Sequence, residues 1–155
     1  MSTFIIAEIG NNHEGSFNLA KKLIKNAKIS GADAVKFQVF KVEKYVSPIN
    51  KFRFRRLKRF QLTFKQFLNL KKYAKKIKIK FFGTPLDEDS LDFLIKNSSI
   101  IKISSGDNNN HHFIDKVLKK NKICIISLGF LNQNEIDNLI KRLIKKFGKK
   151  KSLTI

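Results

Sequence analysis

The sequence holds a single cysteine in 155 residues, Cys124, and that cysteine lies inside an apolar run. One thiol can build neither a disulfide framework nor a cysteine-based zinc site, so both are excluded and a reducing compartment is indicated. The first ten residues, MSTFIIAEIG, lack the basic segment of a secretory signal, and Glu8 interrupts an apolar run that is too short to span a membrane. We therefore expect a cytoplasmic protein without a membrane segment.

Acidic residues are scarce, with 12 Asp and Glu against 33 Lys and Arg, for a net charge of +21. Residues 51–80 contain 13 of the basic residues and no acidic one, and FRFRRLKRF at 52–60 interleaves aromatic and basic side chains. Such a pattern can bind single-stranded nucleic acid through stacking and charge. Because lysine, asparagine and isoleucine are frequent throughout the chain, we favour generic surface charge, then a field that steers an anionic substrate, and nucleic acid last.

Apolar strands alternate with amphipathic helices along the chain, whose length suits one domain. We expect six strands and five helices, the strands at 4–9, 34–39, 77–85, 100–105, 123–129 and 152–155 and the helices at 16–30, 63–76, from 87 onward, 113–119 and 133–147. Ser16, Thr63, Asp87 and Asn132 are the expected helix starts, and Thr63 with Gln66 forms a capping box. Residues 40–61 are interpreted as a long basic connection, and its length favours a functional role.

This alternation predicts an α/β protein with a parallel sheet and helical crossovers. An open doubly wound sheet and a (β/α)₈ barrel both fit the pattern. No GxGxxG follows the first strand, where a dinucleotide-binding fold would place it. A complete barrel needs about 250 residues, so this chain is too short to close one alone.

The stretch GADAVKFQ, residues 31–38, places a lysine on a strand. Side chains alternate along a strand, so Lys36 and Gln38 project to the same face. A lysine in a strand that is buried on both faces is costly unless an anionic group meets it. An edge strand with one face in water is the alternative interpretation.

Polar residues also stand at the carboxyl ends of the other strands, where α/β enzymes form their active sites. The complete set is Glu8, Lys36, Gln38, Thr84, Lys102, Ser105, Asp107 and Ser127. Two lysines and three hydroxyls suit a phosphate or a carboxylate, and the other three side chains suit the hydroxyls of a polar substrate. Each residue also has a structural interpretation: an ion pair for Glu8, turn chemistry for Thr84, and loop starts for the serines. The adjacent His111 and His112 are interpreted as solvated turn residues.

Five strings of this sequence, FIIAEIGNNHEGS, GADAVKFQ, FFGTPLDEDSLDFL, IKISSGD and IISLG, resemble the sialic acid synthase family. That family condenses phosphoenolpyruvate with an N-acylated amino sugar aldehyde to give a nonulosonic acid. The resemblance implies a (β/α)₈ barrel followed by an antifreeze-like domain, in a homodimer. It also implies a divalent metal, manganese or magnesium.

The resemblance assigns roles to the residues at the strand ends. Lys36, Thr84, Lys102, Ser105 and Ser127 would hold phosphoenolpyruvate, while Glu8, Gln38 and Asp107 would face the sugar. Glu8, Lys36 and Lys102 are the implied catalytic residues, and the remaining five are implied substrate-binding residues. All are expected to face one mouth of the barrel.

The chain also departs from the family pattern. Asp107 stands where a glutamate is usual, and Leu128 stands where a small hydroxyl residue is usual. The metal-binding histidines and the antifreeze-like domain would lie beyond Ile155, so no metal ligand is assigned here. We expect residues 1–155 to be a partial barrel domain with strands one to six, incomplete in activity and able to pair with a second copy or a complementing C-terminal chain. A non-catalytic remnant and a nucleic-acid-binding module are the alternatives. The sequence does not decide which amino sugar would be the substrate.

Overall fold

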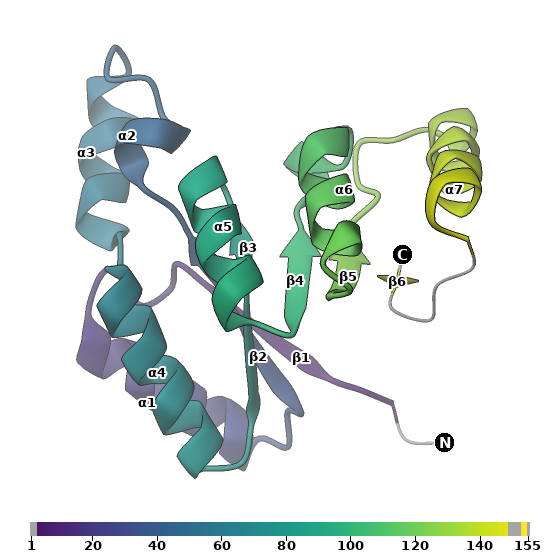
Figure 1. Ribbon diagram of the computed structural model, residues 1–155. Helices are drawn as coiled ribbons and strands as arrows, with labels where there is room; N and C mark the ends of the chain where they lie inside the picture. Colours follow the sequence, from purple (N-terminus) through teal and green to yellow (C-terminus); the bar gives the residue numbers. More distant parts are fainter. Residues whose placement is uncertain (1–2, 149–152, 155) are drawn as a thin grey trace. The chain divides into compact units, whose positions relative to one another are not determined.

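A computed structural model describes residues 3–148, 153 and 154. The chain divides into two compact units, residues 1–98 and residues 99–155. Each unit contains parallel strands joined through helices (Figure 1). Among the residues described, no helix combines the length and the apolar character needed to cross a lipid bilayer.

In the first unit, residues 3–98 form three strands and five helices. In chain order they are β1 (Ile6–Gly10), α1 (Phe17–Ile29), β2 (Ala34–Val39), α2 (Val42–Tyr45), α3 (Lys51–Phe60), α4 (Phe64–Lys76), β3 (Lys80–Pro85) and α5 (Glu88–Asn97). Strand β2 pairs in parallel with β1 on one side and with β3 on the other. The edge-strand interpretation of Lys36 is therefore wrong.

Aromatic side chains pack the helical side of this sheet. The ring of Phe37 on β2 lies 5.0 Å from that of Phe81 on β3, and Phe67 of α4 meets Phe81 at 4.7 Å. Gly83 on β3 leaves room for Leu94 of α5, whose methyl groups lie 3.1 and 3.2 Å from where a Cβ would stand. Figure 1 shows α1 and α4 lying side by side, and the two helices are in contact.

The predicted helix starts are confirmed. The side chains of Ser16, Thr63 and Asp87 accept backbone N–H groups at the starts of α1, α4 and α5, and Thr63 forms the predicted capping box with Gln66. Local capping chemistry thus fixes where these helices begin, because each capping side chain satisfies an N–H that has no partner inside the helix.

The interpretation of residues 40–61 as a long connection is wrong, because this span contains α2 and α3. Asn50 caps α3 by accepting the N–H of Arg53. Leu57 is buried against a small apolar cluster, and Phe54 and Phe60 pack on it. The cluster consists of Phe40, Val42, Val46 and Leu57, with Tyr45, Phe54, Phe60 and Leu86 packed around it. One apolar stripe therefore holds this very basic helix in place.

The described residues of the second unit form three short strands and two α-helices. In chain order they are β4 (Ile100–Ile103), the 3₁₀ turn η1 (Ser105–Asp107), α6 (His111–Lys119), β5 (Ile123–Ile126), α7 (Gln133–Phe147) and β6 (Leu153–Thr154). Strand β5 pairs in parallel with β4 and β6. The sixth strand is thus confirmed at Leu153–Thr154, whereas residues 152 and 155 lie outside the described residues.

The start of helix α6 and the burial of Cys124 can be compared with what the sequence predicted. Helix α6 begins at His111 because Asn110 caps it by accepting the N–H of Phe113, so the turn interpretation of His111 and His112 is wrong. Both histidines are exposed, so their interpretation as solvated residues is confirmed. Cys124 is fully buried, and this burial raises the pKa of its thiol to about 12. The thiol therefore stays protonated and acts as a small apolar core side chain.

Candidate functional site

Four of the predicted site residues lie on one face of the β1–β2–β3 sheet. The strands are in register at Glu8 and Lys36, and again at Gln38 and Thr84. In a parallel sheet, side chains at register partners point to the same face, and so do side chains two residues apart. Glu8, Lys36, Gln38 and Thr84 are therefore on a common face, opposite the Phe37 face that packs against the helices.

Lys36 is a buried lysine, with 5% of its surface exposed. Its Nζ lies 2.5 Å from Oε2 of Glu8, whose side chain is half-exposed. The ion-pair interpretation of Glu8 is therefore confirmed, and the anionic partner that a buried lysine requires comes from the neighbouring strand. The Glu8 side of this ion pair is open to solvent, whereas Lys36 is covered.

Thr84 supplies an unused hydrogen-bond donor on the same face. The residue is 1% exposed, and its Oγ1 has no hydrogen-bond partner among the described residues. The turn interpretation is wrong because Thr84 lies inside β3. A buried hydroxyl without a partner costs free energy, and a ligand oxygen would remove that cost.

His13 lies in the loop between β1 and α1, on the other side of β2. It is 1% exposed, its ring stacks on Phe37 at 5.7 Å, and its Nδ1 accepts the N–H of Gly15 at 3.0 Å. Burial lowers the pKa of His13 to about 4. The imidazole is therefore neutral at physiological pH and supports the loop that follows Glu8.

The second unit carries the other four predicted residues. Lys102 lies on β4, in register with Ile125 of β5. Asp107 lies in η1, where its Oδ2 accepts the hydroxyl of Ser104 at 2.6 Å. Ser105 contacts the loop after β5, because a Cβ added at Gly129 would stand 3.1 Å from the Cβ of Ser105. This packing brings Ser105 close to the strand end that carries Ser127.

Asn108 holds these two loops together, and the sequence interpretation missed it. The residue is 4% exposed, and its amide donates to the carbonyls of Ser127 at 3.3 Å and Gly129 at 2.8 Å. Nothing in the sequence separates Asn108 from Asn109 and Asn110, because all three are equally polar and stand in one run. Only the fold selects which amide is buried.

The described residues do not fit the metal that the family resemblance implies. Within residues 3–148, 153 and 154, no group of three or more histidine, cysteine, aspartate or glutamate side chains is arranged to hold a metal ion. The carboxylate nearest to the buried lysine is already paired with it. The divalent metal and its ligands therefore stay a prediction.

One family model and several curated proteins match most of this chain. The family model described as the NeuB family matches residues 23–155. The N,N′-diacetyllegionaminic acid synthase of Campylobacter jejuni is 38% identical over 99% of this chain and 50% of its own length. The N-acetylneuraminate-9-phosphate synthase of Mus musculus is 32% identical over 93% of this chain and 45% of its own length.

A solved structure is similar across nearly the whole chain. The crystal structure of the sialic acid synthetase of Leptospira borgpetersenii, determined in complex with citrate, matches with a TM-score of 0.87 and 35% identity. The match covers 94% of this chain and 51% of that one. It confirms the predicted α/β class and the incomplete (β/α) barrel. The chain spans about half the length of the curated relatives it matches.

Proposed function

Because this chain belongs to the NeuB family, we propose that it takes part in the condensation of phosphoenolpyruvate with an N-acylated amino sugar aldehyde to form a nonulosonic acid. The curated relatives support the coarser assignment, which is to the family of sialic-type acid synthases. The observation that carries the finer one is the buried Lys36, which has a solvent-open carboxylate partner and lies on the same sheet face as the unused hydroxyl of Thr84.

The charges of this face suit phosphoenolpyruvate. The substrate carries a phosphate and a carboxylate, and a buried lysine with an adjacent hydroxyl donor stabilises such groups through charge-assisted hydrogen bonds. When an anion binds, Lys36 exchanges part of its contact with Glu8 for a contact with the substrate. The freed Glu8 carboxylate, together with Gln38, then accepts hydrogen bonds from the hydroxyls of the sugar.

The second unit contributes its own groups to this proposal. Lys102 supplies a second cation, and Ser105 and Ser127 supply hydroxyl donors from loops that Asn108 fastens together. Asp107 is assigned to the sugar. That both lysines contact one anion stays a prediction.

In the proposed reaction the enol carbon of phosphoenolpyruvate attacks the aldehyde carbon, forming a carbon–carbon bond. The aldehyde oxygen takes up a proton and becomes a hydroxyl. Water adds to the resulting cationic carbon and loses a proton, and phosphate leaves as its carbon–oxygen bond breaks. The protein's contribution is to fix a multiply charged reactant against its partner and to balance the charge that moves.

Binding of phosphoenolpyruvate to the 155-residue chain tests the first step. We expect calorimetry to detect saturable binding that Lys36→Met lowers at least about tenfold, because a charge-assisted hydrogen bond is lost. Lys25→Met is the matched control, since Lys25 is an exposed lysine on α1. Equal loss in both variants would show that only the general positive charge attracts the ligand, and the assignment would then fail.

A condensation assay tests the whole reaction. The chain spans half of its relatives' length, so we expect turnover only when a separately expressed C-terminal half of a relative is added. The product is measured together with released phosphate, which should appear in equal amounts. Substantial turnover by the 155-residue chain alone would contradict the proposed need for a second half.

One feature favours nucleic-acid binding as a second candidate function. Phe52 on α3 is 77% exposed, and the guanidinium of Arg56 lies 5.9 Å from the centre of its ring. Phe52 lines a surface hollow with Lys51, Arg55, Arg56 and Arg59. Single-stranded DNA should then bind with a steep dependence on salt, and the variant with Arg53, Arg55 and Arg56 changed to glutamine should lose this binding. No retention on a nucleic-acid column at low salt would eliminate this function.

A further inference from the structure

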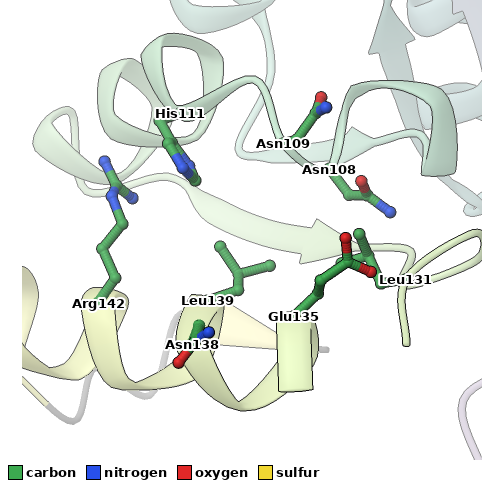
Figure 2. Close-up of a pocket in the computed structure, with 8 residues that line it drawn as sticks. All are labelled: Asn108, Asn109, His111, Leu131, Glu135, Asn138, Leu139 and Arg142. Carbon is green, nitrogen blue, oxygen red and sulfur yellow. The ribbon is translucent and has the colours of Figure 1, made fainter. Parts of the chain in front are cut away.

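The second unit contains a pocket of about 280 Å³ between α6, α7 and the loops that precede them (Figure 2). None of the predicted site residues lines it. The lining residues are Asn108, Asn109, His111, Leu131, Glu135, Asn138, Leu139 and Arg142. The volume is just below the range of about 300–1,000 Å³ that is typical of ligand pockets. The pocket is therefore large enough for one molecule of monosaccharide size.

Arg142 supplies an unused donor at this pocket. One guanidinium nitrogen, Nη2, donates to both oxygens of Asp115 on α6, at 2.8 and 2.7 Å. The other nitrogen, Nη1, is buried and has no hydrogen-bond partner among the described residues. Figure 2 shows the Arg142 side chain extending from α7 toward His111 on α6. A guanidinium nitrogen whose N–H groups have no partner is suited to donate hydrogen bonds to an oxyanion.

Asp115 holds this guanidinium in place through Nη2 and leaves Nη1 without a partner among the described residues. Burial raises the pKa of the Asp115 carboxyl, but hydrogen bonds from Lys146 and Arg142 outweigh burial and hold that pKa below its usual value. Lys146 contacts the same carboxylate at 2.5 Å. The carboxylate is thus shared between two cations, and part of the Arg142 charge is left for a ligand.

Glu135 restricts how much negative charge the pocket can accept. Its Oε2 accepts the N–H of Asn132 in the capping box of α7, and the carboxylate makes no other hydrogen bond to a described side chain. A multiply charged anion would be repelled by this carboxylate, whereas a hydroxyl group can donate to it. Together with Arg142, Asp115 and Lys146, it leaves the formal charge of the pocket near zero.

The rest of the lining matches a polyhydroxylated carbon chain. Asn109, His111 and Asn138 have side chains that can both donate and accept hydrogen bonds. Leu131 and Leu139 offer an apolar surface, and Figure 2 shows Leu139 extending from α7 into the space below His111. Hydroxyls around an apolar C–H face are the chemistry of a sugar.

We propose that this pocket binds a sugar acid, a small polyhydroxylated molecule with a single carboxylate. The carboxylate binds at the Arg142 guanidinium, hydroxyl groups donate to Glu135 and exchange hydrogen bonds with His111 and the asparagines, and the C–H face lies on the two leucines. None of the residues assigned to phosphoenolpyruvate or to its sugar partner lines this pocket.

Gluconate is the probe, since it has one carboxylate and five hydroxyls, and glucose and inorganic phosphate are its comparators. The ¹H–¹⁵N spectra of the 155-residue chain are recorded at about 150 mM salt, which weakens general attraction to the +21 chain. We expect gluconate to shift the amide signals of Asn109, Leu131 and Glu135 saturably. Glucose and phosphate should bind at least about tenfold more weakly, because each lacks one of the two kinds of contact. Equal affinity for phosphate, or shifts confined to α3, would overturn the proposal.

Variants separate this pocket from surface charge and from the proposed phosphoenolpyruvate site. Arg142→Lys keeps a cation for Asp115 but removes Nη1, and it should lower gluconate affinity at least about tenfold. His111→Ala should also weaken gluconate binding, whereas His112→Ala, on the adjacent exposed residue, should not. Lys36→Met should leave the gluconate shifts unchanged. Unchanged binding in both Arg142→Lys and His111→Ala would refute the site.

Discussion

The ammonium group of Lys36 lies 2.5 Å from Oε2 of Glu8, and the lysine is buried while the glutamate is half-exposed. This asymmetry predicts unequal effects of the two single substitutions. Glu8→Gln leaves a buried cation without its counterion and should lower the free energy of unfolding by about 1–3 kcal/mol, less than for a fully buried pair. Lys36→Met replaces the cation with an apolar side chain of similar length and should cost little or even stabilise the protein.

Urea unfolding of both single variants and of the double variant measures these effects. In the double variant, the loss caused by Glu8→Gln should largely disappear, because no buried charge is left. If Lys36→Met were the more destabilising of the two single changes, Lys36 would be a structural residue. Its assignment to an anionic substrate would then lose its support.

A substitution of Thr84 should affect stability and ligand binding in opposite directions. Its buried hydroxyl has no hydrogen-bond partner among the described residues, so Thr84→Val removes an unsatisfied group at nearly constant volume. The free energy of unfolding should stay the same or rise by about 1 kcal/mol, while phosphoenolpyruvate affinity should fall about tenfold. Thr84→Ser keeps the hydroxyl and is the control for binding. A Thr84→Val variant that binds as well as the wild type would remove Thr84 from the site.

His13 predicts a pH dependence of stability. The pKa of its imidazole is lowered by burial from 6.5 to about 4 in the folded chain. Between these two pH values the unfolded chain binds the extra proton and the folded chain does not, so stability falls as the pH falls. The contribution is fully present above pH 6.5 and is lost progressively down to about pH 4, with a total on the order of 2–3 kcal/mol.

Urea unfolding of wild type and His13→Phe between pH 4 and 7 isolates this contribution, because the titrating carboxylates are common to both proteins. Phenylalanine keeps an aromatic ring against Phe37 but cannot titrate. The difference in unfolding free energy between the two proteins should change by about 2–3 kcal/mol as the pH falls from 6.5 to about 4. Parallel stability curves would show that His13 ionises equally in the folded and unfolded chains.

Local chemistry made part of this fold predictable from the sequence. Ser16, Thr63 and Asp87 fix helix starts through hydrogen bonds to residues only three positions away, so the printed sequence contains both partners. The sequence did not indicate helix α3, because its apolar residues Phe54, Leu57 and Phe60 lie in a run of basic residues that hides their helical spacing.

The site was less predictable because its contacts depend on pairing between distant segments. The sequence indicates that Lys36 needs an anion, but only the register of β1 on β2 shows that Glu8 supplies it. Burial of Asn108 likewise depends on where the loop after β5 passes. The pocket beside Arg142 requires the packing of α7 on α6, which no motif in the sequence indicates.

Asn108 should be the most sensitive residue of its asparagine run. Asn108→Asp replaces an amide that donates to the carbonyls of Ser127 and Gly129 with a carboxylate that repels them. We expect a loss of about 2–4 kcal/mol in the free energy of unfolding, because two hydrogen bonds are lost and a charge is buried. Asn109→Asp, at the adjacent exposed position, should change stability by less than about 0.5 kcal/mol. Similar losses in the two variants would mean that the Asn108 amide does not hold the loop after β5.

Alanine substitutions at Gly15 and Gly31 separate the cost of backbone strain from the cost of steric overlap. Both have positive φ, +82° and +85°, so alanine at either position adopts an unfavourable conformation. At Gly31 the added Cβ meets nothing within 4 Å, and the cost should be about 1–2 kcal/mol from the conformation alone. At Gly15 the added Cβ would stand 1.9 Å from the carbonyl oxygen of Arg59, so the loop after β1 and the end of α3 must separate. Gly15→Ala should therefore lower the free energy of unfolding by at least about 2 kcal/mol more than Gly31→Ala, as measured by urea unfolding. Equal losses would mean that the loop bearing His13 does not rest on α3, and that the backbone beside Glu8 is free to move without that helix.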